Sequence, residues 1–464
     1  MFRRILIANR GEIAVRVIRA CREMEIETVA VYSSADADAL HVQLATRSVC
    51  IGPPQASQSY LNMDAILQVA IATRCDAIHP GYGFLSENDV FSDRCRAEGI
   101  KFIGPTGDVI RQMGNKSAAR SLMQKSGVPV VPGSDGNVDI ETGAVVAAKI
   151  GYPVLVKASA GGGGRGMRRV DKPEDFAALF AEAQSETMAN FGDDKMYVEK
   201  LIVNPHHIEF QVMADSKGNV VHFGERECSI QRKNQKLMEE SPSHLLTPEV
   251  RAAMGDAAVT AAKAAGYEGA GTIEFVMDDD LHYYFIEMNT RIQVEHPVTE
   301  MVCDVDLVRE QIRVAAGLTL AYKQADICQR GWAIECRINA EDPMNGFRPS
   351  PGKTNFLHFP GGCGIRVESA LYVGYNPSPF YDSMVAKVIA HGANRLEAIQ
   401  RMRRALEEIV IDGYPTTVEL CYLILHDPIF VRGNYNTGFL ESEMDELMKW
   451  NRVGAGLDPI EVNQ

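Results

Sequence analysis

The sequence lacks any run of apolar residues that approaches the roughly 20 needed to span a membrane. Its 10 cysteines contain no Cys-x-x-Cys pair, so neither a zinc site nor a disulfide framework is indicated, and reduced thiols in the cytoplasm are expected. Basic residues are the minority, since 47 Lys and Arg face 61 Asp and Glu, giving a formal charge of -14. Such a surface repels nucleic acid and anionic membranes, so neither is expected as the main partner.

What is present is the composition of an ordinary globular protein, with 46% hydrophobic and 23% charged residues. The length of 464 residues exceeds one compact core and predicts two to four domains. Residues 1–9 begin with basic and then apolar residues, as a signal peptide does. Because the apolar run is short and a helical pattern follows at once, we interpret it as a first strand.

The first hundred residues alternate short β-rich runs with helical patterns. Strands are predicted at residues 5–8, 28–32, 76–79 and 101–103, and an amphipathic helix at residues 12–24. This alternation predicts a parallel sheet covered by helices. The unit resembles a dinucleotide-binding fold, but Asn9-Arg10-Gly11-Glu12 lacks the second and third glycines of that fingerprint. Dinucleotide binding is therefore rejected.

Two further units follow along the chain. The second begins near Gly114, and the turn-rich residues 128–133 suit a hinge into a smaller subdomain that ends near Ile202. The third begins near Gly331. Within them the patterns predict a helix at residues 305–316, a strand at residues 384–390 and a helix at residues 396–410.

Residues 285–297 carry the most informative pattern. Polar side chains occupy every second position, which in an extended chain places them on one face; they are Glu287, Asn289, Arg291, Gln293 and Glu295. A solvated edge strand could show the same alternation. The mixture of carboxylates, an amide and an arginine instead favours a site that handles a metal, an anion and a proton. Glu274 lies on a run that could pair with this strand as a hairpin, and these oxygen ligands suit Mg²⁺ bound to phosphates.

Other polar segments admit two interpretations each. Glycines 161–164 follow Lys157, so their N–H groups could cover phosphates, or the loop could be a flexible hairpin tip. The lysine precedes the glycines, which excludes the Walker pattern. Lys116 alone is typical of a solvated lysine. Lys236 lies in a densely polar loop as a candidate anion ligand, and Arg337 lies in an alternating strand where an internal ion pair is usual.

Taken together, these segments resemble biotin carboxylase, a member of the ATP-grasp superfamily. The similarity is carried by residues 7–14, 79–87, 287–299, 336–343 and 412–413, and by Lys157 with its glycine loop. It implies a multidomain α/β and α+β fold. The expected parts are a Rossmann-like N-terminal domain (1–113), an ATP-grasp domain (114–317) with a mobile lid (about 131–202), and a mixed α/β C-terminal domain (331–446).

The resemblance also implies a reaction in which ATP, bicarbonate and biotin on a carrier protein give ADP, phosphate and carboxybiotin. ATP would be held by Lys116, Lys157, Gly163, Gly164, Glu199, Lys200, Leu201, Ile202, His207, Gln231, Asn234, Glu274 and Glu287. Mg²⁺ or Mn²⁺, usually two ions, would be bound by Glu274, Glu287 and Asn289. Bicarbonate would be bound by Lys236, Arg291, Gln293, Val294 and Glu295, and biotin by Tyr82 and Arg337.

The implied catalytic residues are Lys236, Arg291, Glu295 and Arg337. Bicarbonate is a poor nucleophile, so Glu295 is expected to remove its proton as it attacks the γ-phosphate. Lys236 and Arg291 would orient the anion. The resulting carboxyphosphate would decompose to CO₂ and phosphate, the phosphate would deprotonate biotin, and Arg337 would stabilise its enolate-like oxygen. Gln293 is left without a firm role.

Two positions depart from the family pattern. Asn234 stands near the expected ribose site, where a histidine is frequent, so nucleotide affinity is expected to change more than the chemistry. Cys363 stands where an aromatic residue can occur at the family's dimer contact. Arg19, Glu23 and Arg366, which that contact also uses, are present, so a homodimer is expected.

Fused members of the family carry a biotinyl lysine within Ala-Met-Lys-Met or a close relative. The Met-Lys pair here, Met448-Lys449, lies in a helical tail, so biotin is expected on a separate carrier protein rather than on this chain. Separate carboxyltransferase subunits are expected too, most often those of acetyl-CoA carboxylase, or else of another acyl-CoA carboxylase. The rival functions are a different ATP-grasp ligase that joins a carboxylate to an amine, and a catalytically inactive nucleotide-binding regulator.

Overall fold

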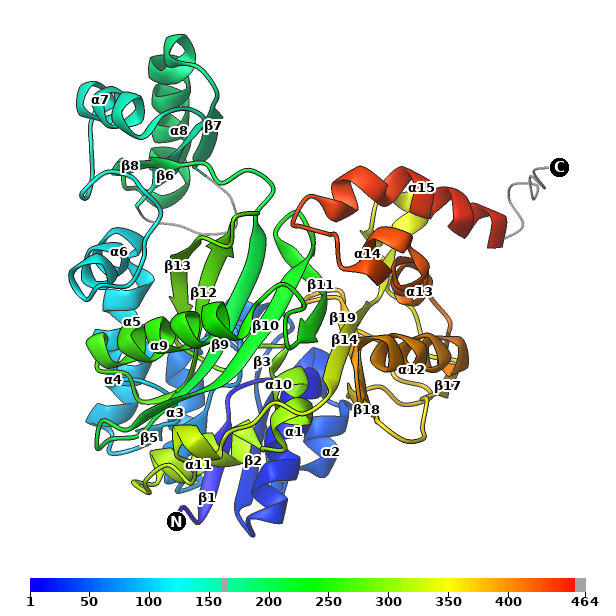
Figure 1. Ribbon diagram of the computed structural model, residues 1–464. Helices are drawn as coiled ribbons and strands as arrows, with labels where there is room; N and C mark the ends of the chain where they lie inside the picture. The colour runs from blue at the N-terminus through cyan, green and yellow to red at the C-terminus, as the bar shows by residue number, and fades with distance from the viewer. Residues whose placement is uncertain (160–165, 455–464) are drawn as a thin grey trace, which may run out of the picture.

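The computed structural model describes residues 1–159 and 166–454 (Figure 1). Its N-terminal unit is a parallel sheet in the order β3-β2-β1-β4-β5. Its strands are β1 (Arg4–Ile7), β2 (Glu27–Ser33), β3 (Arg47–Gly52), β4 (Ala77–His79) and β5 (Lys101–Phe102). Its helices are α1 (Gly11–Glu23), α2 (Leu40–Leu44), α3 (Met63–Ala72), α4 (Asp89–Ala97) and α5 (Gly107–Gly114).

Both faces of this sheet are buried, which explains the continuous apolar run at residues 5–8, in and just after β1. Ile5 and Ile7 pack on the side of α1, whereas Leu6 and Ala8 join the core beneath α3 and α4. The four predicted strands and the first helix are present within a residue or two. β3 was missed because it is an edge strand whose side chains are largely exposed, so it carries no continuous apolar signal.

The central layer is an eight-stranded antiparallel sheet in the order β13-β12-β9-β10-β11-β14-β19-β18. Its strands are β9 (His206–Ala214), β10 (Val220–Arg232), β11 (Gln235–Ser241), β12 (Gly269–Met277), β13 (Tyr283–Asn289), β14 (Trp332–Asn339), β18 (Ile365–Ser369) and β19 (Met384–Gly392). β11 pairs with β14, so a single sheet includes strands from both the second and the third predicted units, which were expected to meet near Gly331. Side chains from both units are therefore held in one framework.

A smaller subdomain projects from the body at the upper left of Figure 1. Its antiparallel sheet, in the order β7-β6-β8, packs against two helices around Phe176 and Phe180. The elements are α7 (Ile140–Ile150), β6 (Val154–Ala158), β7 (Met167–Val170), α8 (Phe176–Phe191) and β8 (Met196–Lys200).

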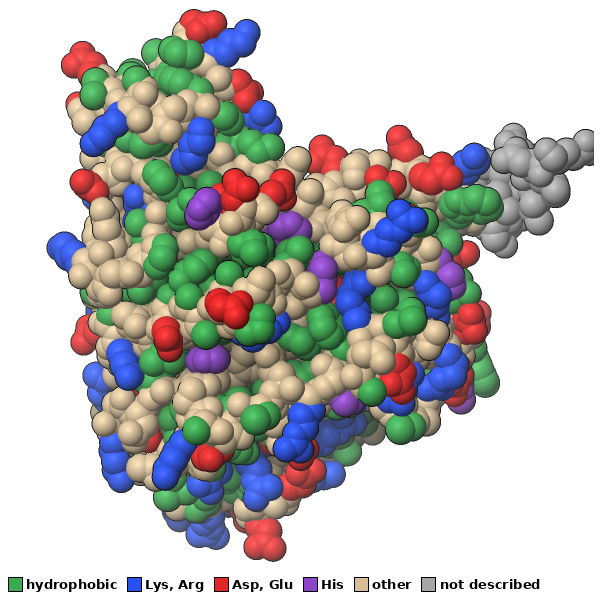
Figure 2. Space-filling model, viewed as in Figure 1, with side chains coloured by type: hydrophobic (Ala, Val, Ile, Leu, Met, Phe, Trp, Pro, Cys, Tyr) green, Lys and Arg blue, Asp and Glu red, His purple; other side chains and the backbone are tan. Residues whose placement is uncertain are grey.

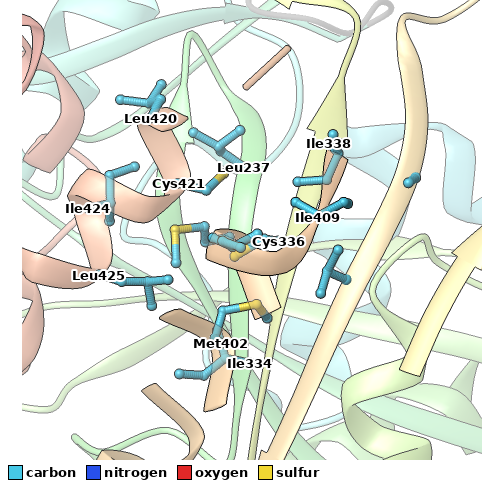
Figure 3. Packing of buried hydrophobic residues seen from close by; sticks show 14 of the residues in the cluster. Leu237, Ile334, Cys336, Ile338, Met402, Ile409, Leu420, Cys421, Ile424 and Leu425 are labelled. Atoms are coloured by element: carbon cyan, nitrogen blue, oxygen red, sulfur yellow. The ribbon is translucent and has the colours of Figure 1, made fainter. Parts of the chain in front are cut away.

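The remaining helices cover the large sheet. These helices are α6 (Lys116–Lys125), α9 (Pro248–Ala264), α10 (His296–Cys303), α11 (Leu307–Ala315), α12 (Arg395–Glu408), α13 (Val418–His426), α14 (Pro428–Arg432) and α15 (Phe439–Gly454). The C-terminal strands of the sheet pack on α12 and α13. Figure 3 shows Cys336 of β14 facing Met402 of α12 and Cys421 of α13. Four short strands complete the fold: β15 (Glu341–Asp342), β16 (Arg348–Pro349), β17 (Phe356–His358) and β20 (Val410–Asp412).

Among the described residues no helix is both long and apolar enough to cross a membrane. On the face shown in Figure 2, basic and acidic side chains are intermixed over the surface. The helix predicted at residues 396–410 ends at Glu408, and Val410 begins β20 instead.

Candidate active site

A cleft of about 630 Å³ opens where the carboxyl ends of β1 and β4 meet the large sheet. Open α/β sheets bind ligands at this edge. The predicted site residues that line the cleft are Tyr82, His207, Asn234, Lys236, Glu274, Glu287, Asn289, Arg291, Gln293, Val294, Glu295 and Arg337. Segments more than 250 residues apart in sequence thus supply one site.

The prediction that residues 287–295 form one extended strand is wrong. β13 ends at Asn289, and Glu295 is already the residue that precedes helix α10. The chain bends at Thr290, whose backbone N–H donates to Glu87 Oε1 over 3.1 Å, and Pro297 lies in the first turn of the helix. The five alternating polar side chains nevertheless all line the cleft. Glu287 and Asn289 lie on β13, whereas Arg291, Gln293 and Glu295 lie on the loop that follows it.

The predicted hairpin is present, and Glu274 of β12 lies directly opposite Glu287 of β13. Asn289 donates to Glu274 Oε1 over 2.8 Å. Burial alone would raise the pKa of Glu274, but the Lys236 ammonium and His207 hold that pKa well below its usual range. Two carboxylates and an amide oxygen from paired strands, facing the same cleft, are the donor set that Mg²⁺ takes. These residues fit a divalent metal that bridges phosphates.

Lys236 lies at the centre of the buried charges. Its Nζ is 2.6 Å from Glu209, 3.0 Å from Glu274 and 2.8 Å from Glu295. Burial disfavours the ammonium, yet these carboxylates raise the pKa of Lys236 well above its usual range. Glu209, His207 and Glu274 also lie close enough together to hold a metal, but the ammonium already compensates two of these carboxylates.

Glu295 is shared by two cations. Its Oε1 accepts from Lys236, and its Oε2 accepts from Arg337 Nη2 over 2.9 Å. Against the effect of burial, Lys236 and Arg337 keep the pKa of Glu295 well below its usual range, so the carboxylate is ionised. Arg337 also donates to Glu239, over 2.6 Å from Nε, while its side chain stays 16% exposed toward the cleft. The internal ion pair predicted for Arg337 is present, and it lies in the site.

Arg291 and Val294 are held by Glu87 and Lys387, two residues without a predicted role, and Arg291 also contacts Asn289. Arg291 Nε donates to Glu87 over 2.9 Å, and its Nη2 donates to Asn289 over 3.0 Å. Lys387, fully buried in β19, donates to the carbonyl of Val294 over 2.7 Å. A single lysine in the apolar run at residues 384–390 was the signal available in the sequence, since buried lysines almost always have a partner.

The same lysine connects the N-terminal unit to the site. Lys387 Nζ lies 3.1 Å from Glu12 of α1, and the Tyr82 hydroxyl donates to the same carboxylate. Burial, followed by the charge of Glu12, raises the pKa of Tyr82 well above its usual range. Tyr82 is therefore a neutral hydroxyl with its proton committed to Glu12.

The residues predicted for the nucleotide are divided between the cleft, a smaller neighbouring hollow lined by Lys116, and the base of the subdomain. Lys116 lies 3.4 Å from Glu287, and Lys157 is paired with Glu199. Lys200 donates to the carbonyls of Gly151 and Tyr152, which fixes its side chain at the hinge. Leu201 and Ile202 follow β8 directly, and Gly163 and Gly164 lie outside the described residues.

His207 couples the nucleotide side to the carboxylates. Its Nδ1 lies 2.7 Å from Gln231 Nε2, and its Nε2 lies 3.0 Å from Glu274 Oε2. Because a carboxylate only accepts, a proton on Nε2 would face Glu274 and leave Nδ1 to accept from Gln231. Asn234 lies at the tip of the β10–β11 hairpin with φ +64°, a conformation that asparagine tolerates better than most residues.

Three family models together cover nearly the whole chain. Residues 1–110 match the N-terminal domain of biotin carboxylase, and residues 335–442 match its C-terminal domain. Residues 115–323 match the ATP-binding domain of the carbamoyl-phosphate synthase L chain. A nucleotide-binding domain with a projecting subdomain, flanked by these N-terminal and C-terminal domains, defines an ATP-grasp ligase.

Individual proteins narrow this class. Biotin carboxylase 1 of Bacillus subtilis is 55% identical over 444 residues, covering 95% of this chain and 99% of that protein. A Campylobacter jejuni biotin carboxylase structure aligns with a TM-score of 0.92 at 48% identity, covering 95% of this chain and 99% of that one. The biotin carboxylase domain of Hydrogenobacter thermophilus 2-oxoglutarate carboxylase, a dimer in complex with MgADP, ADP and bicarbonate, has a TM-score of 0.91 and 51% identity, covering 96% of this chain and 99% of that one. The chain belongs to the biotin carboxylase family, and the predicted fold class is confirmed.

Proposed function

We propose that this chain, an ATP-dependent ligase that carboxylates biotin, acts on biotin carried by a separate protein, and that the reaction is the first half-reaction of acetyl-CoA carboxylase. The observation that carries the site assignment is Glu295, an ionised carboxylate held between Lys236 and Arg337 at the wall of the cleft. This arrangement brings a base, an anion ligand and an oxyanion ligand within contact of one another.

In the proposed mechanism, Lys116 and Lys157 exchange their carboxylate partners for the phosphates of ATP. Glu274, Glu287 and Asn289 would hold Mg²⁺, which would supply neutralisation of the phosphate charge. The nucleotide side is completed by Glu199, Lys200, Leu201, Ile202, His207, Gln231 and Asn234.

Lys236, Arg291, Gln293 and the backbone of Val294 orient bicarbonate toward the γ-phosphate. Glu295 removes the proton of bicarbonate as its oxygen attacks. The low pKa of Glu295 makes it a weak base in the free protein. A bound anion beside Lys236 competes for the cations that lower this pKa, so the basicity of Glu295 rises when bicarbonate enters.

Carboxyphosphate then decomposes to CO₂ and phosphate, and the phosphate removes the ureido proton of biotin. Arg337 stabilises the developing oxyanion of biotin, with Tyr82 beside it at the cleft wall. Glu239 keeps the guanidinium plane in place through the Nε contact. A preorganised donor of this kind needs no reorganisation at the moment of reaction.

The half-reaction is tested by ADP release in the presence of bicarbonate, with and without free biotin. The proposal expects ADP release that depends on bicarbonate and rises with biotin. Stimulation by an amine and a carboxylate substrate in place of biotin would favour a different ATP-grasp ligase. Complete absence of turnover would favour a nucleotide-binding regulator.

The acceptor needs a separate experiment, since one polypeptide of the pyruvate carboxylase of Methanothermobacter thermautotrophicus is also 52% identical, over 97% of this chain. Copurification from the native source identifies the carrier and the transferase subunits. The reconstituted complex is then offered acetyl-CoA, propionyl-CoA or pyruvate together with labelled bicarbonate. Label in malonyl-CoA supports the proposal, whereas label in a different product assigns another carboxylase.

We also propose a homodimer through the surface around Arg19, Glu23 and Arg366. Within this chain Arg19 contacts Glu368 over 3.0 Å, and Arg366 contacts Glu300 over 2.8 Å. These carboxylates therefore hold the arginines in place near the proposed contact. Sedimentation velocity over a range of concentrations tests the dimer and the influence of Cys363, with Cys363→Phe as the variant expected to tighten it.

A further inference from the structure

Arg226 lies in β10 and is fully buried, and the proposed mechanism makes no use of it. Its guanidinium donates five hydrogen bonds, to Glu209 (2.5 Å), Gln211 (2.8 Å), Gln293 (2.9 Å), Thr299 (3.0 Å) and Thr272 (3.1 Å). Five is the full donor capacity of arginine. Burial of a charge is costly without such complete pairing, so this side chain has a single defined position.

The chemistry of its neighbours fixes the amide of Gln293. Arginine only donates, so the Gln293 atom that faces Arg226 must be Oε1. The Glu274 carboxylate only accepts, so the atom that faces it over 2.8 Å must be Nε2. Both contacts require the same orientation. Because an amide nitrogen carries two hydrogens, Gln293 retains a second N–H in addition to the one donated to Glu274, and the residue lines the cleft.

Arg226 also fixes both ends of the segment that carries Val294 and Glu295. It contacts Gln293 before them and Thr299 after them, in the first turns of α10. Only a planar fork with several donors can hold two such points at once.

We propose that Arg226 is a positioning residue that makes Gln293 a hydrogen-bond donor to the anion in the cleft. This inference rests on the proposed function in one respect, namely that the anion is bicarbonate. Without Arg226 the Gln293 oxygen loses the donor that holds it, and the contact with Glu274 alone opposes rotation of the amide. A rotated amide presents its oxygen to the cleft, and that oxygen repels an anion.

The first test is Arg226→Lys, assayed by ADP release in buffers freed of dissolved bicarbonate. Loss of a hydrogen bond to a charged partner predicts a KM for bicarbonate raised by about tenfold or more, with the KM for ATP changed by less than about twofold. KM does not depend on the fraction of folded enzyme, so partial instability does not imitate this result. A bicarbonate KM within about twofold of wild type, or an equal rise in both KM values, overturns the proposal.

Arg395→Lys is the matched control. Arg395 is another largely buried arginine, held by Glu240 over 2.7 and 3.0 Å, and it does not line the cleft. The proposal expects its variant to keep both KM values. If Arg395→Lys raises the bicarbonate KM as Arg226→Lys does, the effect is a general loss of rigidity and the proposal is overturned.

A double variant tests whether Arg226 affects the anion by positioning Gln293 or instead through its contact with Glu209, which in turn contacts Lys236. If Arg226 acts through Gln293, then Arg226→Lys adds less than about a twofold change in the bicarbonate KM when Gln293→Ala is already present. If the increases in the bicarbonate KM of the two single variants multiply in the double variant, Arg226 does not act through Gln293 and the proposal is overturned.

Gln293→Glu covers the case in which Arg226→Lys does not fold. A carboxylate there offers only acceptors, so its KM for bicarbonate should exceed that of Gln293→Ala; an equal or lower value overturns the inference. Wild-type protein that cleaves ATP without any dependence on bicarbonate overturns both the proposed function and this inference. Wild-type turnover with an unaffected Arg226→Lys variant overturns the inference alone.

Discussion

Two consecutive carboxylates on β11, Glu239 and Glu240, are both fully buried and both paired with arginine, yet their surroundings differ. Glu240 accepts from Trp332 (2.5 Å), from Arg395 (2.7 and 3.0 Å) and from the Tyr435 hydroxyl. Glu239 accepts from Arg337, and its Oε2 has no hydrogen-bond partner among the described residues. Burial opposes ionisation in both, but Arg395 lowers the pKa of Glu240, whereas the pKa of Glu239 rises to about 7.

The difference shows what distinguishes a structural pair from a site. Glu240 and Arg395 satisfy each other, with Arg395 also donating to the carbonyls of Phe430 and Val431. Arg337 is instead divided between Glu239 and Glu295, and it lines the cleft. An arginine that is divided between two carboxylates and also lines the cleft can take a third anionic partner, which is what a site for a developing oxyanion requires.

The largest expected effect separates the two regions by activity. Glu295→Gln removes the proposed base and should lower bicarbonate-dependent ADP release by about 100- to 10,000-fold. The affinity for the nucleotide, measured by calorimetry, should stay within about threefold of the wild-type value, because Glu295 is not one of the predicted ATP ligands. Glu240→Gln, the same chemical change at the carboxylate that is paired with Arg395 outside the cleft, should leave the KM values unchanged. Equal loss of ATP binding and turnover in Glu295→Gln would show a structural or nucleotide role.

Next in size is the arginine exchange. Arg337→Lys removes the planar fork from the cleft and should lower biotin-stimulated ADP release by about 100- to 1,000-fold. The slower ADP release without biotin should persist, since bicarbonate attack precedes the biotin step. Both rates are measured in the same assay. If Arg337→Lys depresses both rates alike, then Arg337 serves bicarbonate activation rather than biotin.

Stability should show the reverse ranking. Glu240→Gln leaves Arg395 buried without a charged partner and should lower the free energy of unfolding by about 3–5 kcal/mol. Glu239→Gln should lower it by less than about 2 kcal/mol, because Arg337 keeps Glu295 and the amide oxygen still accepts. Urea unfolding monitored by circular dichroism measures both. A larger loss for Glu239→Gln would contradict the contrast drawn between the two clusters.

The smallest effect is on the pH dependence of stability. The pKa of Glu239 in the folded protein, about 7, exceeds its ordinary value of 4.5. Its protonated form therefore favours folding at low pH, and this contribution is lost as the pH rises through about 7. The free energy of unfolding of wild type, measured relative to that of Glu239→Gln, should therefore fall as the pH rises from about 5 to about 7. For Glu240, whose pKa is lowered, the contribution is present above the ordinary value and is lost as the pH falls below it.

Much of the fold could be predicted from local patterns. The apolar runs within β1, β2 and β4 are continuous because both faces of the parallel sheet are buried. In α1 the apolar residues Ile13, Val17 and Cys21 recur at helical spacing. The β12–β13 hairpin was predicted from two strands joined across residues 278–280, and it is present. β3 and the end of α12 were misjudged because exposed edges and short junctions carry little apolar signal.

Many of the residues that line the cleft could be named from the sequence, but their arrangement could not. The two-residue period at residues 287–295 indicated one strand face, whereas a bend at Thr290 and the start of α10 deliver Arg291, Gln293 and Glu295 from a loop. Glu87 and Lys387, which hold Arg291 and the Val294 carbonyl, come from other units of the chain. No local pattern reports such distant partners.

By itself the sequence determined the chemistry available to this protein: hard oxygen ligands, lysines for phosphates, and an Arg and a Glu for the anion and its proton. Side-chain type is a property of the single residue, so it can be read without coordinates. The tertiary structure alone decided which charges meet. Lys236 contacts three carboxylates, Glu295 divides its oxygens between two cations, and the pKa values of Glu239 and Glu240 shift in opposite directions. Protonation and hydrogen-bond direction follow from these contacts, because burial and neighbouring charge, rather than residue type, set a pKa.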